Sequence, residues 1–190
     1  MTYEEFDDIA FKYGTDKTPR INHPYTPYYY ELLKDKKINT VLELGIGGKP
    51  YMDKLERDGF KNVLGGSLKM WRDFLGAKVY GIDYDKDCMF EDRDIKTFCA
   101  HGAREKDLKE VLAQIPTPID LFIDDGSHVP KHQVQTAKIL LPLLKKDVIY
   151  VIEDVRHYEY VMEELKDYEI EMPDMPRRVR GDRLLIIKNK

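Results

Sequence analysis

Acidic side chains follow two short apolar runs of the sequence. The runs are residues 119–123 and 148–152, and the acid pairs that follow them are Asp124-Asp125 and Glu153-Asp154. Runs of this length and β-branched content predict strands buried on both faces of a sheet, where ligands gather at the carboxyl ends. If the strands are neighbours, the carboxylates converge and repel one another unless a cation or a proton intervenes. The sequence therefore predicts a metal site at this edge.

Oxygen ligands suit a hard divalent cation such as Mg²⁺. Asp125, Glu153 and Asp154 are the candidate ligands. His128 follows Asp125 across a short turn, and its ordinary pKa of about 6.5 lets it accept a hydroxyl proton near neutrality. A hydroxyl that binds a metal ion loses its proton more readily than a free one. These residues therefore predict a metal-assisted site in which His128 is the general base.

Some of these residues also have a purely structural interpretation, which stays open at this stage. Asp154 can cap the helix expected from residue 156, Asp124 can accept hydrogen bonds from loop amides, and His128 can be an ordinary loop histidine. Residues 83–87 space their acids like a calcium loop, but Cys88 stands where that loop requires glycine. We therefore exclude a calcium loop there.

A glycine-rich turn, Gly45-Ile46-Gly47-Gly48, follows the apolar run 40–44. Pro50 stands where dinucleotide-binding loops carry their third glycine. Glu43 is unfavourable beside a pyrophosphate but favourable beside the amine and sulfonium groups of S-adenosylmethionine. Asp83, at the end of the next apolar run, is placed to accept hydrogen bonds from ribose hydroxyls. The turn therefore indicates S-adenosylmethionine rather than a nicotinamide cofactor.

Short apolar runs alternate with amphipathic stretches, which is typical of an α/β fold with a mostly parallel sheet and helices on both faces. We expect strands over residues 40–44, 78–82, 95–100, 119–123 and 148–152, and a closing pair over 168–172 and 183–187. We expect helices over residues 68–75, 106–114, 131–144 and 156–166, and one or two more, within 6–13 and 25–33, that cover a sheet edge. One domain is expected over residues 1–190, with a helical cover at 1–36 and a Rossmann-like core at 37–190.

The length and charge of the chain narrow its class. The sequence has 190 residues and a formal net charge of −4, which suits one domain and gives no general attraction to nucleic acid. No signal-peptide pattern or membrane-spanning apolar run is visible, and the two cysteines lack metal-ligand spacing. We expect a cytoplasmic protein that binds a small molecule and neither nucleic acid nor membrane; a homo-oligomer is possible. The basic residues 177–180 are interpreted as a solvated loop.

Several segments together resemble the metal-dependent sugar O-methyltransferases of macrolide biosynthesis, of the mycinamicin and macrocin type. The segments are residues 13–17 (YGTDK), 25–29 (YTPYY), 41–48 (VLELGIGG), 65–71 (GGSLKMW), 80–83 (YGID), 123–128 (IDDGSH) and 150–154 (YVIED). They occur in the family's order and span nearly the whole chain. The combination is specific, although each part alone is not.

The resemblance implies a class I methyltransferase fold that binds S-adenosylmethionine. The cofactor contacts that it implies are Glu43, Gly45, Gly47, Ser67 and Asp83. It also implies that Asp125, Glu153 and Asp154 bind Mg²⁺ and that His128 is the general base. In such enzymes the metal binds vicinal hydroxyls of a sugar, and one oxygen attacks the sulfonium methyl group. The expected partner is therefore a glycoside acceptor of natural-product biosynthesis.

Two departures from the family pattern affect the details. Residues 50–64 form a longer link than usual, so we expect the substrate side to differ, and Ala103 stands where the family often has an acid. A catechol-type O-methyltransferase and a cofactor-binding module without turnover are the alternative functions. Glu43 and the broken glycine pattern disfavour an NAD-dependent oxidoreductase.

Overall fold

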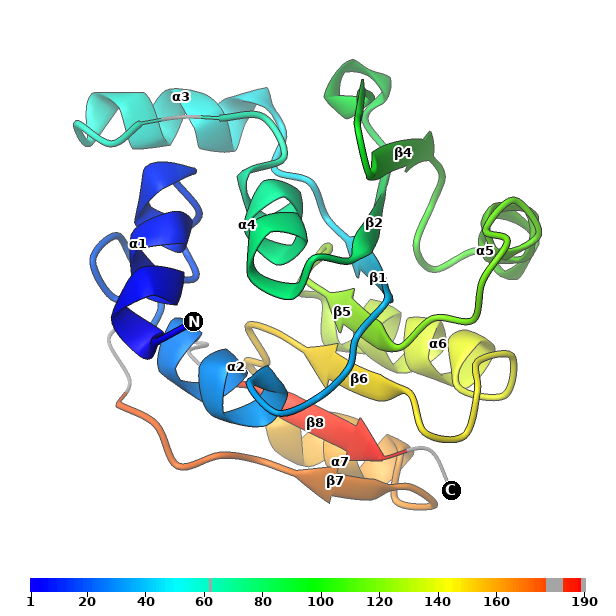
Figure 1. Cartoon of the computed structure of the whole chain (residues 1–190). Helices are drawn as coiled ribbons and strands as arrows, with labels where there is room; N and C mark the ends of the chain where they lie inside the picture. Colours follow the sequence, from blue (N-terminus) through cyan, green and yellow to red (C-terminus); the bar gives the residue numbers. More distant parts are fainter. Residues whose placement is uncertain (62, 177–182, 189–190) are drawn as a thin grey trace.

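The strands form one eight-stranded sheet. A computed structural model describes residues 1–61, 63–176 and 183–188 (Figure 1). The strands are β1 (Thr40–Leu44), β2 (Lys78–Asp83), β3 (Glu91–Asp92), β4 (Ile95–Cys99), β5 (Leu121–Asp124), β6 (Ile149–Ile152), β7 (Glu169–Glu171) and β8 (Leu185–Lys188). Their order is β3-β4-β2-β1-β5-β6-β8-β7, and the five from β4 to β6 run parallel to one another. The expectation of a mostly parallel sheet is confirmed.

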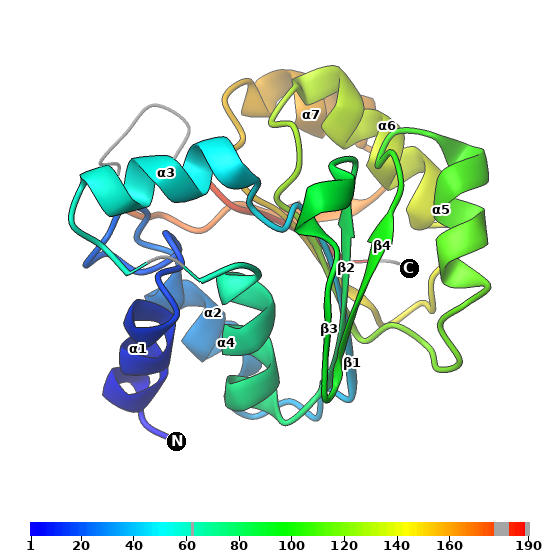
Figure 2. The same ribbon diagram turned by 90° about the horizontal axis from the view of Figure 1, so that it is seen from above.

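Helices cover both faces of the sheet. They are α1 (Tyr3–Lys12), α2 (Thr26–Leu33), α3 (Lys49–Arg57), α4 (Gly66–Leu75), α5 (Glu105–Leu112), α6 (Pro130–Leu140) and α7 (Tyr158–Glu164), with a 3₁₀ turn, η1, at Lys86–Cys88. Figure 2 shows α1, α2 and α4 on one face and α5, α6 and α7 on the other. Each face has its own apolar core, and the strands lie between the two.

The N-terminal helices cover a face of the sheet rather than an edge. Phe6 of α1 and Tyr29 of α2 belong to the same buried cluster as Leu121 and Ile123 of β5. The edge positions are taken by the antiparallel strands β3 and β7. The expectation that these helices cover an edge is therefore wrong.

The structure also contains elements that the apolar pattern did not predict. The helix α3 begins directly after the glycine-rich turn, has Pro50 in its first turn and buries Leu55. The two-residue strand β3 is too short to have a periodicity of its own. No helix of the described residues is long and apolar enough to cross a membrane. The basic run 177–180 lies outside the described residues.

The sheet topology brings the acid-tipped strands together. The condition for convergence of the acids is met: β5 and β6 are neighbours, and Asp124 pairs with Ile152 in their parallel register. On the other side of β5, Asp124 pairs with Leu44 at the end of β1. The strand order reverses at β1, because β2 and β5 flank it. In sheets of this kind ligands bind in the crevice beyond the strands at such a point.

Candidate active site

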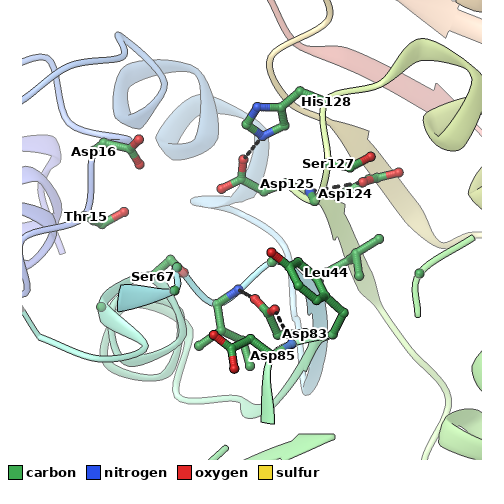
Figure 3. A pocket seen from close by; sticks show the side chains of 18 of the residues that line it. Thr15, Asp16, Leu44, Ser67, Asp83, Asp85, Asp124, Asp125, Ser127 and His128 are labelled. Atoms are coloured by element: carbon green, nitrogen blue, oxygen red, sulfur yellow. Dashed lines mark hydrogen bonds and ion pairs between the residues drawn. The ribbon is translucent and has the colours of Figure 1, made fainter. Parts of the chain in front are cut away.

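A pocket with a volume of about 570 Å³ lies at the carboxyl ends of the strands (Figure 3). Loops that follow four strands contribute to its wall: residues 45–48 after β1, 83–85 after β2, 100–103 after β4 and 124–128 after β5. Residues 14–16, between α1 and α2, line it as well, and α3, α4 and α6 contribute further side chains to the wall. The predicted residues Gly45, Gly47, Ser67, Asp83, Asp125 and His128 all line this pocket.

The glycine loop requires glycine at the point where it meets the β5 loop. Gly45 has φ +99°, and a Cβ atom there would lie 2.1 Å from the carbonyl oxygen of Asp125. The backbone N–H of Asp125 in turn donates to the carbonyl of Leu44 at 2.9 Å. Gly47 also has a left-handed conformation, with φ 86°. The two loops are therefore in direct backbone contact, and a side chain at residue 45 would separate them.

Asp83 holds the glycine loop from the other side. One oxygen of its carboxylate accepts the backbone N–H of Ile46 at 3.0 Å, and the other accepts the N–H of Asp85 at 3.0 Å. A carboxylate oxygen has further acceptor capacity, so these bonds leave Asp83 able to accept a ligand hydroxyl. Ser67 reaches the pocket from the first turn of α4.

Asp125, His128 and Asp154 form a compact group. The Nε2 atom of His128 lies 3.1 Å from Oδ1 of Asp125, and its Nδ1 atom lies 3.5 Å from Oδ2 of Asp154. One ligand atom from each residue lies within 4.8 Å of the others, so the three can hold one metal ion. Figure 3 shows the imidazole of His128 directed at Asp125. Sequence reasoning named all three residues, although it gave His128 the role of base.

The backbone of this group is strained. His128 has φ 52° and Asp154 has φ 53°, in the left-handed region that side chains disfavour. Within the described part of the chain, Arg93 is the only other non-glycine residue with positive φ. Such strain costs of order 1–3 kcal/mol per residue and persists where the surroundings impose it, often at functional sites. The fold therefore fixes the positions of the His128 and Asp154 side chains through their strained backbone.

Glu153 lies outside this group, and its predicted role as a metal ligand stays a prediction. Its carboxylate is buried: one oxygen accepts from the hydroxyl of Tyr29 at 2.5 Å, and the other pairs with Nζ of Lys17 at 2.7 Å. Glu153 and Asp154 follow the end of β6 at Ile152, and Asp154 has a left-handed backbone conformation, so the two adjacent side chains meet different partners. Asp154 instead accepts a hydrogen bond from the hydroxyl of Tyr25 at 2.5 Å.

Glu43 is likewise buried beneath the glycine loop rather than on the pocket wall. Its Oε2 atom accepts the indole N–H of Trp71 at 2.9 Å, and its Oε1 atom lies 3.2 Å from Nζ of Lys17. Burial raises the pKa of Glu43 to about 7, although Lys17 opposes this shift. The predicted contact of Glu43 with a cofactor amine remains a prediction, since the present partners of its carboxylate lie within the protein.

Sequence reasoning did not identify Lys17, Tyr25 and Tyr29 as partners of the predicted acids. Lys17 is 1% exposed, and its Nζ atom also pairs with Oδ2 of Asp125 at 2.6 Å. All three residues lie in the segments 13–17 and 25–29 that carried the family resemblance. The sequence motifs thus contained these residues, but the motifs did not predict which side chains the residues would contact.

The electrostatics of the group favour a bound cation. Burial works against a charged His128, but the hydrogen bond with Asp125 and the charges of Asp125, Asp154 and Asp124 outweigh burial and raise the pKa of His128 to about 9. Burial would raise the pKa of Asp125, but Lys17 and His128 lower it well below its ordinary value. In the chain alone, His128 is therefore protonated at neutral pH, and its positive charge offsets the charges of the neighbouring carboxylates.

One carboxylate oxygen of Asp124 accepts a hydrogen bond from a loop amide, as its structural interpretation expected. The other oxygen has no hydrogen-bond partner among the described residues. The accepting atom is Oδ1, which lies 3.3 Å from the backbone nitrogen of Gly126, and the unpaired atom is Oδ2. Burial, reinforced by the charge of Asp125, raises the pKa of Asp124 to about 7. Asp124 also lines the pocket, and its unpaired Oδ2 atom is buried.

Known proteins similar in sequence are sugar O-methyltransferases; no family model matches the chain. Over 152 residues the chain is 34% identical to the 8-demethyl-8-α-L-rhamnosyl tetracenomycin-C 2′-O-methyltransferase of Streptomyces olivaceus, a match that covers 78% of the chain and 37% of the relative. It is 30% identical over 154 residues to the demethylmacrocin O-methyltransferase of Streptomyces fradiae, with 80% and 36% covered. The matched region thus spans little more than a third of these curated relatives.

Solved structures of methyltransferases share the fold. The MycE methyltransferase of the mycinamycin biosynthetic pathway, in complex with Mg, SAH and mycinamycin VI, superposes with a TM-score of 0.75 at 21% identity and covers 96% of this chain and 54% of that one. The SAH-bound Podospora anserina methyltransferase PaMTH1 gives a TM-score of 0.59 at 11% identity, with 98% and 88% covered. The expected class I methyltransferase fold is confirmed.

Proposed function

Because the chain is related to sugar O-methyltransferases and has the class I methyltransferase fold, we propose that it transfers a methyl group from S-adenosylmethionine to a hydroxyl of a sugar-containing or other vicinal-diol small molecule, with the help of Mg²⁺. The observation that carries the proposal is the position of the Asp125–His128–Asp154 group. Asp125 and His128 line the same pocket as the glycine loop, and Asp125 touches that loop through its backbone.

The described residues fit the proposed methyl donor. The loop at Gly45 and Gly47 presents backbone without side chains, which lets a ligand approach closely. Asp83 offers acceptor capacity for ribose hydroxyls, and Ser67 offers a hydroxyl group at the pocket wall. The anionic side chain of Asp125, with the acidic residues Asp16 and Asp124 beside it, favours a ligand with positive charge over one with a pyrophosphate. The cofactor, when bound, would supply the methyl group on its sulfonium.

The donor atoms also fit a hard divalent ion. Asp125 and Asp154 each contribute a carboxylate oxygen, and the open pocket leaves room for water and for acceptor hydroxyls. A divalent ion there would supply positive charge that favours the ionised form of a hydroxyl. Glu153, which the resemblance also implies as a ligand, stays a proposed ligand, because its carboxylate oxygens keep acceptor capacity beside their contacts with Tyr29 and Lys17.

His128 is the proposed acceptor of the hydroxyl proton. The negative charges of Asp125, Asp154 and Asp124 hold it protonated in the chain alone, so positive charge in the group is needed to lower its pKa. Asp125 fixes the Nε2 atom by a hydrogen bond, and the imposed backbone conformation fixes the ring relative to the loop. The protein therefore orients the base and the reactants, and such orientation supplies a large part of the rate.

A panel of acceptors tests the function. Transfer of a labelled methyl group from S-adenosylmethionine would be measured to methyl α-L-rhamnopyranoside and other simple glycosides, and to catechol. We expect methylated glycosides and no methylated catechol. Methylation of catechol alone would favour the catechol-type alternative. Tight binding of S-adenosylhomocysteine without methylation of any vicinal diol would favour a cofactor-binding module.

A further inference from the structure

Two tyrosine hydroxyls from one side of α2 each bond to one acid of the pair Glu153-Asp154. The hydroxyl of Tyr25, at the N-cap of α2, donates to Oδ1 of Asp154 at 2.5 Å. The hydroxyl of Tyr29, four residues later, donates to Oε1 of Glu153 at 2.5 Å. Residues four apart lie on the same side of a helix, so a single helix reaches two acids that are adjacent in the chain.

The Tyr25 hydroxyl holds the backbone of Asp154 as well as its side chain. It accepts the backbone N–H of Asp154 at 3.3 Å and donates to the carboxylate of the same residue. A phenol can do both, because its oxygen is a donor and an acceptor. Asp154 has φ 53°, a conformation that residues with a side chain disfavour. Two hydrogen bonds with one hydroxyl therefore hold a strained residue whose other oxygen, Oδ2, faces His128.

Packing fixes both phenol rings within the N-terminal layer. Tyr25 and Tyr29 are both 0% exposed. The ring of Tyr25 stacks on the imidazole of His23 with the ring centroids 5.0 Å apart, and the ring of Tyr29 packs edge-to-face with Trp71 at 4.7 Å. A side chain that is locked by packing and bonded to a carboxylate can orient that carboxylate.

Each phenol occupies one oxygen of its acid and leaves the second oxygen near a partner of Asp125. Oδ2 of Asp154 lies 3.5 Å from Nδ1 of His128, and Nε2 of the same imidazole lies 3.1 Å from Asp125. Oε2 of Glu153 lies 2.7 Å from Nζ of Lys17, which also pairs with Asp125. The second oxygens of the pair are therefore each separated from Asp125 by a single side chain.

We propose that Tyr25 and Tyr29 are positioning residues that hold the carboxylates of Asp154 and Glu153 in the arrangement that binds the divalent ion. Carboxylates that bind a metal are commonly oriented by hydrogen bonds of this kind, and loss of one typically weakens metal binding or activity about 10- to 100-fold. Neither tyrosine needs to touch the ion or the substrate. The inference rests on the proposed function, since it takes both acids as ligands of Mg²⁺.

Tyr25→Phe and Tyr29→Phe remove the hydroxyl groups and keep the rings. In calorimetric titration with Mn²⁺ we expect binding to weaken about 10- to 100-fold in Tyr25→Phe and about tenfold in Tyr29→Phe. The first loss should be the larger, because Asp154 loses two hydrogen bonds and Glu153 loses one. The affinity for S-adenosylhomocysteine should stay within about twofold, since the glycine loop is a separate part of the pocket.

Tyr28→Phe is the matched control. Tyr28 lies on the same helix, and its hydroxyl donates to the backbone carbonyl of Asp174 at 2.9 Å rather than to a carboxylate. We expect the Mn²⁺ affinity of this variant to stay within about twofold of the wild-type value. An equal loss in Tyr28→Phe would refute the positioning role, and so would wild-type affinity in either Tyr25→Phe or Tyr29→Phe.

The melting temperature separates positioning from a general effect on stability. A merely structural role predicts a lower melting temperature with unchanged Mn²⁺ affinity, whereas positioning predicts weaker binding, and a loss of methyl transfer that excess Mg²⁺ offsets. If Tyr25→Phe does not fold, the comparison of Tyr29→Phe with Tyr28→Phe decides. If the wild-type chain binds no divalent ion, the proposed function fails. If the wild-type chain binds Mn²⁺ and both variants bind it equally well, only the positioning role fails.

Discussion

The two ends of β5 carry the same chemical pair in different surroundings. At the amino end, Asp120 pairs with Lys145 at 2.6 Å, and at the carboxyl end, Asp125 pairs with Lys17 at 2.6 Å. Asp120 also accepts the backbone N–H groups of Asn39 and Thr40, so both of its oxygens have partners. The ammonium group of Lys145 therefore meets a carboxylate that already accepts two backbone N–H groups.

The carboxyl end differs in charge balance and burial. Lys17 is 1% exposed and meets three acids, whereas the side chain of Lys145 is 29% exposed. Asp124 has an oxygen without a partner, and His128 and Asp154 hold a strained backbone conformation. A structural ion pair satisfies its own groups, while a site leaves charge and hydrogen-bonding capacity for a ligand. The unpaired groups at the carboxyl end of β5, rather than the ion pair that both ends share, indicate a ligand site there.

Asp125→Asn should have the largest effect, because Asp125 contacts His128, Lys17 and the proposed metal position together. We expect methyl transfer to fall by about 10⁴-fold, the upper end of the range for lost acid–base groups, and Mn²⁺ affinity to fall with it. Kinetics and calorimetric titration would measure both. Asp120→Asn, at the other end of the strand, is the control and should keep wild-type activity. Equal losses in the two variants would erase the contrast between the ends.

His128→Ala should reduce turnover by roughly 10²–10⁴-fold, the contribution of a positioned base. The affinity for S-adenosylhomocysteine should stay within about twofold, since an altered base leaves the glycine loop and Asp83 in place. Steady-state kinetics and calorimetry would separate the two quantities. A wild-type rate for this variant would remove His128 from the role of base.

Gly45→Ala should weaken the methyl-donor site. The new Cβ would lie 2.1 Å from the carbonyl oxygen of Asp125, so the two loops must move apart. We expect the affinity for S-adenosylhomocysteine to drop by roughly tenfold or more, with a stability loss of about 1–3 kcal/mol from backbone strain. Gly59→Ala is the matched control, because Gly59 also has positive φ but nothing within 4 Å of its Cβ position. An equal loss of affinity in the control would refute the loop contact as the cause.

Lys145→Met should have the smallest effect, about 0.2–1 kcal/mol of stability after solvent screening, with no change in activity. Burial would raise the pKa of Asp120, but the hydrogen bond from Lys145 and the N–H groups of Asn39 and Thr40 lower it. A lowered pKa stabilises the fold above the unfolded value of about 3.9, and this contribution disappears as the pH falls through the folded value. The difference in melting temperature between variant and wild type should therefore shrink below pH 4. A difference that grows in acid would contradict the assignment.

The sequence was sufficient for the sheet and for the location of the site. The apolar runs before Asp124 and Glu153 predicted buried strands, and the glycine turn after β1 predicted a ligand loop; both lie at one edge of the sheet. These features are local, since a strand and the residues that follow it are adjacent in the chain. Local patterns therefore sufficed to bring these residues to one edge of the sheet.

What the sequence did not predict depends on contacts between distant residues. Lys17 meets Asp125 and Glu153 across separations of 108 and 136 residues, and no spacing rule connects them. Glu153 and Asp154 were treated as one acidic pair, but they follow the end of β6, and Asp154 has a left-handed backbone conformation and other partners than Glu153. The helix α3 was missed because Pro50 was considered only as a replacement for glycine, although proline is favoured in the first turn of a helix.

The dependence of methyl transfer on a divalent ion tests the account most directly. Transfer from S-adenosylmethionine to a vicinal-diol glycoside would be measured with the chain as purified, after treatment with excess EDTA, and after Mg²⁺ is restored. We predict that chelation abolishes transfer, because the Asp125–His128–Asp154 group is left without its cation, and that Mg²⁺ restores it. Full activity in excess EDTA would contradict the account.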